Sequence, residues 1–173
     1  LGIPELIEKI LEKPETCQFA ASRLVADEHL LYIGRGLDYA LSMEGSLKLK
    51  EVSYIHSESY AAGELKHGTI SLIDEDVPVI AVATQTGIIP KTISNVVEVK
   101  SRGAKVILVC TDACARELKD GVADYVIEIP HTDELLMPIT AVVPLQILAY
   151  YTSINRGIDP DKPKNLAKSV TVE

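Results

Sequence analysis

The sequence has no tryptophan, one phenylalanine and only three cysteines. Cys17, Cys110 and Cys114 are odd in number and follow no metal-ligand spacing, so we expect reduced structural thiols in a cytosolic protein, with no metal and no cofactor. A basic cluster is also missing, and the net charge is −8, which argues against nucleic acid or an anionic membrane as a partner. No apolar run reaches the roughly 18 residues of a membrane span and no cationic leader is present, which favours a soluble, cytoplasmic protein.

Apolar residues make up 47% of the 173 positions, enough for the core of one domain. We expect an N-terminal helical segment at 1–28, the main domain at 29–158 and a C-terminal tail at 159–173. The chain begins at Leu1 without methionine, which suggests a piece of a longer protein.

Short strands alternate with longer helices along the chain. Helical spacing predicts helices at 4–26 with a break near Pro14, and at 39–54, 88–102, 112–120 and 137–155, where Pro138 and Pro144 leave the start open. A short apolar run predicts a strand at 29–33, and runs rich in Val and Ile predict buried parallel strands at 78–83, 105–110 and 125–129, with 55–60 as a candidate edge strand. This alternation predicts an α/β fold, a doubly wound, flavodoxin-like parallel sheet of about five strands flanked by helices.

Ligands of such sheets bind at the carboxyl ends of the strands, so the loops there are candidate binding sites. Tyr32-Ile-Gly-Arg-Gly36 is either a tight strand-to-helix turn or an anion site with a GxG pattern that lacks a third glycine. The segment 84–87, Thr-Gln-Thr-Gly, suits either a phosphate or a helix cap. Both alternatives remain open at this point.

Three charged residues share one face of the helix predicted at 39–54. Glu44, Lys48 and Glu51 follow one another at i, i+4 and i+7, which is either ordinary solvated pairing or a proton-transfer base held beside a lysine. His67, between Lys66 and Gly68, is a candidate functional histidine on a loop or a helix end.

The C-terminal tail contains an unusual lysine. Asn165-Leu-Ala-Lys168-Ser-Val-Thr-Val-Glu173 follows a stretch rich in Pro, Asp and Lys that cannot continue a helix. A solvated charge is the default explanation for Lys168, but burial of Leu166, Val170 and Val172 would dock the tail and carry Lys168 inward. A partly desolvated lysine can lose its proton and form a Schiff base with a carbonyl.

Four motifs, in the same order, closely resemble the glucosamine-6-phosphate synthase family, also called glutamine–fructose-6-phosphate aminotransferase (isomerising). They are Tyr32-Ile-Gly-Arg-Gly36, Glu44-Gly-Ser-Leu-Lys-Leu-Lys-Glu51-Val-Ser-Tyr-Ile-His56, Tyr60-Ala-Ala-Gly-Glu-Leu-Lys-His67-Gly68 and the tail. The resemblance runs from about residue 30 to the end, and implies the second sugar-isomerase (SIS) subdomain of the isomerase region, with a five-stranded parallel sheet.

The resemblance also implies roles. Lys168 would form the imine with C2 of open-chain fructose 6-phosphate, and Glu51 would move a proton between C1 and C2. His67 would assist ring opening from the neighbouring subunit of a homodimer, and Lys48 would adjust the charge of the site. The product would be glucosamine 6-phosphate, for amino-sugar biosynthesis leading to UDP-N-acetylglucosamine.

Two parts of that family have no counterpart in the sequence, namely the glutaminase domain and the Ser/Thr-rich phosphate cradle of the first SIS subdomain. We therefore expect the chain alone to be inactive. The alternatives are a SIS-type sugar-phosphate sensor, which has no use for an imine-forming lysine, and a related glutamine-independent amino-sugar phosphate isomerase or deaminase.

Overall fold

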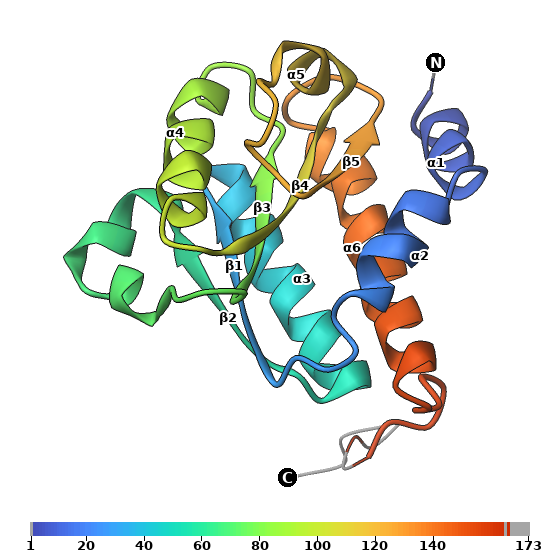
Figure 1. Cartoon of the computed structure of the whole chain (residues 1–173). Coiled ribbons are helices and arrows are strands. Elements are labelled where there is room, and N and C mark those ends of the chain that lie inside the picture. The colour runs from blue at the N-terminus through green and yellow to red at the C-terminus, as the bar shows by residue number, and fades with distance from the viewer. Residues whose placement is uncertain (1, 165, 167–173) are drawn as a thin grey trace, which may run out of the picture.

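The structure, a computed structural model, describes residues 2–164 and 166. Its centre is a parallel sheet of five strands in the order β2-β1-β3-β4-β5 (Figure 1). The strands are β1 (His29–Gly34), β2 (His56–Ala61), β3 (Pro78–Ala83), β4 (Lys105–Thr111) and β5 (Tyr125–Ile129). The order reverses direction between β1 and β3, which makes the sheet doubly wound and confirms the predicted fold class.

Helices cover both faces of the sheet. One face carries α1 (Ile3–Leu11), α2 (Glu15–Ser22), α3 (Leu37–Ser53) and α6 (Met137–Asn155). The other face carries α4 (Ile89–Lys100), α5 (Asp112–Glu117) and two 3-10 helices, η1 (Ala62–His67) and η2 (Thr69–Leu72). All helices and strands predicted from the sequence are present, including edge strand β2.

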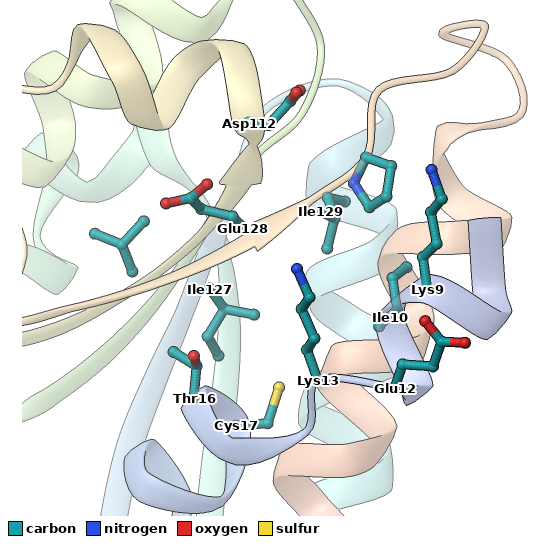
Figure 2. Close-up of a pocket in the computed structure, with 12 residues that line it drawn as sticks. Lys9, Ile10, Glu12, Lys13, Thr16, Cys17, Asp112, Ile127, Glu128 and Ile129 are labelled. Carbon is teal, nitrogen blue, oxygen red and sulfur yellow. The ribbon is translucent and has the colours of Figure 1, made fainter.

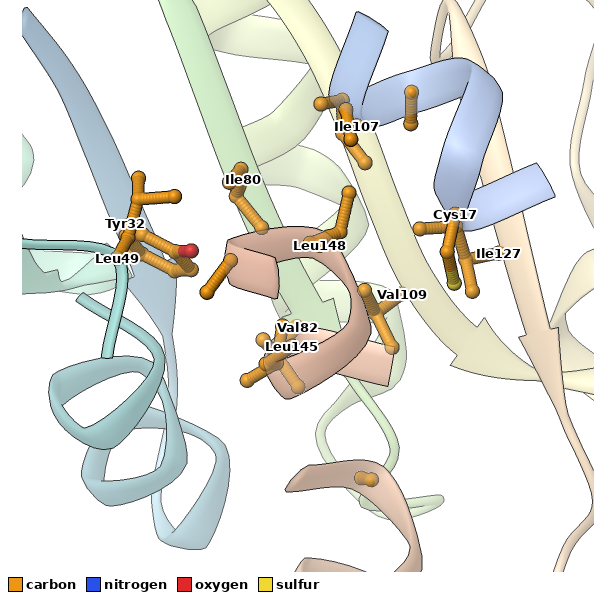
Figure 3. Packing of buried hydrophobic residues seen from close by; sticks show 14 of the residues in the cluster. Cys17, Tyr32, Leu49, Ile80, Val82, Ile107, Val109, Ile127, Leu145 and Leu148 are labelled. Atoms are coloured by element: carbon orange, nitrogen blue, oxygen red, sulfur yellow. The ribbon is translucent and has the colours of Figure 1, made fainter. Parts of the chain in front are cut away.

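Alternate strand residues enter two separate cores. Tyr32, Ile80 and Val109 pack with Leu145 and Leu148 of α6 on the first face, as Figure 3 shows. Their neighbours along the strands pack against α4 and η1 on the second face. Because both faces are covered, the strands read as continuous apolar runs rather than as alternating ones.

Pro14 and Pro138 stand at helix starts. Pro14 separates α1 from α2, as predicted, and Pro138 stands in the first turn of α6, where no backbone N–H is needed. Pro144 lies inside α6 without ending it. This helix is long and apolar enough to span a membrane by length and composition, yet 56% of that apolar window is buried in the fold, as in a core helix.

The three cysteines are free and buried, as the sequence predicts for structural thiols. Burial raises the pKa of Cys17 to about 12, so this side chain is a neutral thiol at physiological pH. A neutral, buried thiol packs as a small apolar group and is a poor nucleophile.

Helices α3 and α6 approach each other closely. A Cβ atom added to Gly45 of α3 would stand 2.9 Å from Cδ1 of Leu145, closer than real side chains pack. At the far end of the same pair, the Ser153 hydroxyl lies 2.8 Å from the Val52 carbonyl oxygen. The C-terminal ends of the two helices are therefore fixed beside each other, and the tail begins at this point.

Candidate functional site

Three charged side chains cluster on α3, as the sequence predicts. The Lys48 ammonium donates a hydrogen bond of 2.7 Å to Oε2 of Glu51 and lies 3.7 Å from Oε1 of Glu44. The Lys48 and Glu51 side chains are 35% and 28% exposed, so both are partly shielded yet accessible to a ligand. The Glu51 carboxylate therefore stays accessible while it keeps a cationic neighbour.

The neighbouring carboxylates keep Lys48 in its protonated form. The hydrogen bond to Glu51 raises the pKa of Lys48 above its ordinary value, and the nearby charge of Glu44 acts in the same direction. Lys48 therefore stays protonated at neutral pH. An amine must be unprotonated to attack a carbonyl, so Lys48 is suited to charge stabilisation and not to imine formation.

The position of Glu51 differs from the usual location of ligands in such sheets. Helix α3 starts directly after β1, at the carboxyl edge of the sheet, and runs back along the first face. Glu51 comes fourteen residues after Leu37, which is about 21 Å along the helix at 1.5 Å per residue. The candidate base therefore lies at the opposite end of α3 from the loops that follow the strands.

Those loops are joined by a carboxylate that the sequence reasoning missed. Asp38, 1% exposed, accepts hydrogen bonds from the backbone N–H of Thr84 at 2.8 Å and of Gln85 at 3.3 Å, and another from the Thr84 hydroxyl. Burial raises the pKa of Asp38, although the hydrogen bonds from Thr84 and Gln85 oppose that rise. An acidic residue in the first turn of a helix after Gly-Arg-Gly is its only sequence signal, and surface aspartates at helix starts give the same signal.

Asp38 also bears on the open alternatives for the two loops. Its carboxylate occupies two backbone donors of the 84–87 segment, and Gln85 Oε1 accepts the Leu37 N–H at 2.8 Å at the start of α3. Gly36 has a φ of 58° and forms the tight turn between strand and helix. These contacts favour the turn and cap interpretations over a phosphate site.

His67 does not meet Glu51 within one chain. It ends η1, the second of the two alternatives that the sequence left open, and its side chain is 75% exposed with Nε2 3.7 Å from Oε2 of Glu64. Leu65 anchors η1 in the core on the α4 face of the sheet, whereas Leu49 of α3 belongs to the core on the other face. The two predicted site residues are thus carried on opposite faces.

Lys168 lies outside the described residues, but the described part of the tail reaches α3. The backbone N–H of Lys164 donates a hydrogen bond of 2.5 Å to the Tyr54 hydroxyl, and the Lys164 ammonium lies 5.7 Å from the centre of that ring. Tyr54 is the C-cap of α3, three residues after Glu51. The expectation that Leu166 is buried is wrong, because it is half exposed: the contact with the fold is made two residues earlier, by Lys164.

A large cleft lies elsewhere in the fold. It has a volume of about 570 Å³ and separates α1 and α2 from edge strand β5 (Figure 2). Lys9 and Lys13 line it together with Asp112 and Glu128, and the two carboxylates weaken any attraction for a phosphate. None of Lys48, Glu51 and His67 lines it, and within residues 2–164 and 166 no group of His, Cys, Asp or Glu could hold a metal ion.

Comparison with known protein families assigns the chain to a class of domain. The SIS domain family matches residues 23–156, and the chain belongs to this family.

Over all 173 residues the chain is 51% identical to the glutamine–fructose-6-phosphate aminotransferase (isomerising) of Clostridium perfringens. It is 47% identical, again over its whole length, to the enzyme of the same name from Thermococcus kodakarensis. The chain spans only 28% of the length of each relative.

Solved structures agree with this assignment. The C-terminal domain of glucosamine-fructose-6-phosphate aminotransferase from Francisella tularensis has a TM-score of 0.88 and 36% identity, and the match covers 92% of this chain and 44% of that one. A glucosamine-6-phosphate deaminase from Thermotoga maritima has a TM-score of 0.66 and 27% identity, with 96% of this chain and 46% of that one covered. The chain therefore matches a little under half of each of these two larger proteins.

Proposed function

We propose that this chain is the catalytic half of the isomerase region of a glutamine–fructose-6-phosphate aminotransferase. The activity is the conversion of fructose 6-phosphate and glutamine-derived ammonia into glucosamine 6-phosphate. The observation that carries the proposal is the Lys48–Glu51 pair, 2.7 Å apart, on the end of α3 that the C-terminal tail contacts through Lys164 and Tyr54. Relatives with about half of their residues identical over the whole chain carry this enzyme name.

The chemistry divides between two groups. The unprotonated amine of Lys168 attacks the C2 carbonyl of the open-chain sugar, and loss of water leaves an imine. Ammonia then displaces the lysine amine from C2, and Glu51 takes a proton from C1 and delivers it to C2. Lys48, which remains cationic, holds the Glu51 carboxylate in place and balances its charge.

We propose that His67 acts in the site of a second copy. Glu51 and His67 belong to opposite faces of the same chain, so one chain does not bring them together, and a homodimer supplies the missing histidine. His67 is 75% exposed and free to project from the surface, where it exchanges protons with sugar oxygens during ring opening.

Subunit mixing tests this arrangement. The test uses the full-length enzyme. A Glu51→Gln variant mixed with a His67→Asn variant should regain about a quarter of the wild-type activity, because half of the dimers are mixed and each mixed dimer has one intact site. Glu51→Gln mixed with Lys168→Arg is the matched control and should regain none, since both residues serve the same subunit's site. Recovery in neither mixture would contradict a shared site, and sedimentation showing only monomers at high micromolar concentration would contradict the dimer.

The remaining functions are assigned to other parts of a longer polypeptide. The relatives are more than three times as long as this chain, so we propose that a glutaminase domain and a first SIS subdomain supply ammonia and anchor the phosphate. We further propose that the enzyme is cytoplasmic, where its phosphorylated substrate and product are retained.

The direct test is product formation by the full-length protein. With fructose 6-phosphate and glutamine it should form glucosamine 6-phosphate, and Glu51→Gln should lower this rate at least about 100-fold, the range of general acid–base catalysis. Release of ammonia from glucosamine 6-phosphate, with no glutamine-dependent synthesis, would instead identify a deaminase. Tight sugar-phosphate binding without turnover would identify a sensor.

A further inference from the structure

Tyr54 has an unusual backbone conformation. Its φ is 60° and its ψ is 16°, the left-handed conformation in which a helix commonly ends, and its N–H donates to the Lys50 carbonyl at 3.3 Å. Glycine normally occupies this position because a Cβ atom is strained there, and asparagine is the next most frequent residue. Among the described residues only Asp76 is another non-glycine residue with positive φ, and aspartate tolerates that conformation. A tyrosine here therefore retains strain that a simpler residue would remove.

The side chain of Tyr54 makes two contacts with Lys164 of the C-terminal tail. Its hydroxyl accepts the backbone N–H of Lys164 at 2.5 Å, and its ring faces the Lys164 ammonium at 5.7 Å. Both contacts join the end of α3 to a residue 110 positions later in the chain. A glycine or an asparagine would relieve the backbone but would lose the ring.

Hydrogen bonds at the end of α6 fix the place where the tail leaves the fold. The Ser153 hydroxyl lies within hydrogen-bond distance of the carbonyl oxygens of Val52 and Ile158, at 2.8 and 3.0 Å. Arg156 donates to the carbonyls of Val25 and Asp27, each at 2.9 Å, and fixes the turn after α6. The segment that leaves α6 thus starts beside Val52 and next contacts Tyr54.

We propose that Tyr54 is a positioning residue that docks the C-terminal tail on the end of α3 and so delivers Lys168 to Glu51. The proposal rests on the function proposed above. Tyr54 follows Glu51 by three residues and caps the same helix, so the contact between Tyr54 and Lys164 lies at the end of α3 that carries Glu51. Lys168 follows Lys164 by four residues, which span at most about 14 Å of extended chain, so docking of Lys164 limits how far Lys168 can lie from the end of α3.

Proteolysis tests the docking independently of any activity. Trypsin cleaves after Lys164, whereas Pro163 protects the bond after Lys162. Tyr54→Asn should increase cleavage after Lys164 about tenfold, and Tyr54→Phe, which keeps the ring, should increase it about threefold, because opening of a local segment controls such cleavage. Tyr150→Ala is the matched control. It removes a different exposed tyrosine, which lies on α6, and should leave the rate of cleavage after Lys164 unchanged. Equal cleavage of wild type and Tyr54→Asn would overturn the proposal.

The Tyr54→Asn variant also distinguishes a loss of docking from a loss of folding stability. Because it tolerates positive φ, Tyr54→Asn should unfold at the same temperature as wild type or higher. In the full-length enzyme the same variant should lower kcat about tenfold with little change in the KM for the sugar, and Tyr54→Phe should recover part of it. Wild-type kcat in Tyr54→Asn would overturn the proposal, whereas a full-length wild type without turnover would overturn the proposed function and leave the trypsin result to decide the docking.

Discussion

The ammonium of Lys48 and the carboxylate of Glu51 stand 2.7 Å apart, one turn from each other on α3. A simple surface ion pair stabilises a helix by only about 0.3–0.5 kcal/mol, so stability gives little reason to shield the pair. Both side chains are nevertheless about two-thirds shielded, and the tail crosses the helix end three residues later. These observations support the proposal that the pair is an acid–base site beside the tail.

Replacement of Lys48 tests whether its charge serves this site. Lys48→Met removes the cation beside Glu51 but keeps a side chain of similar length. It should lower kcat of the full-length enzyme roughly tenfold, equivalent to about 1.4 kcal/mol of transition-state stabilisation. Lys48→Arg keeps the charge and should lose much less. Equal losses in the two variants would show that the exact shape of the lysine, and not its charge, is required.

Asp38 should be essential to stability and not to chemistry. Asp38→Ala leaves the buried Thr84 N–H without a partner and should lower the free energy of unfolding by about 2–3 kcal/mol. Asp133→Ala is a suitable control, because Asp133 lies in an exposed turn before α6 and accepts only local hydrogen bonds. Chemical denaturation of the 173-residue chain measures both values.

The pKa of Asp38 adds a pH dependence of known sign. Burial raises this pKa in the folded state above the ordinary aspartate value of about 3.9. The folded chain therefore binds this proton more tightly than the unfolded chain, and the associated stability is present at low pH and lost as pH rises through the folded pKa. The stability of wild type relative to Asp38→Asn should increase as pH falls from 7 to 4. A decrease in this relative stability between pH 7 and pH 4 would contradict a raised pKa for Asp38.

The 173-residue chain alone should not make glucosamine 6-phosphate, even with ammonia supplied. No phosphate anchor is assigned to this half, and the donors of its 84–87 loop are partly occupied by Asp38. Without an anchor the sugar is not held over Glu51, and positioning contributes much of the rate of such reactions. Measurable turnover of fructose 6-phosphate by the purified chain would refute this.

The sequence predicts the fold well because its signals are local. Apolar runs bounded by helical spacing locate β1, β3, β4 and β5, and Pro14 and Pro138 mark helix starts. The parallel orientation of the strands follows from the same alternation, since parallel strands require crossover connections.

The site was only partly predictable for the opposite reason. Glu44, Lys48 and Glu51 are neighbours on one helix, so their spacing reveals their common face. Asp38 and Tyr54 act through partners 46 and 110 positions away, and no local pattern distinguishes them from an ordinary helix start and helix end. The wrong expectation for Leu166 has the same origin, because apolar character alone does not say which tail residue meets the fold.

Borohydride trapping with labelled fructose 6-phosphate tests the central claim, that Lys168 forms the imine and Glu51 moves the proton. Arginine keeps the charge of Lys168 but stays protonated near neutral pH, and the amide of Glu51→Gln is no base. In the full-length enzyme Glu51→Gln should retain the trapped adduct, Lys168→Arg should show none, and Lys162→Arg, a matched control at an exposed lysine of the same segment, should trap as wild type does. Exchange of the C1 hydrogen with solvent should be lost in both Glu51→Gln and Lys168→Arg. Wild-type trapping and exchange in Lys168→Arg would contradict the account.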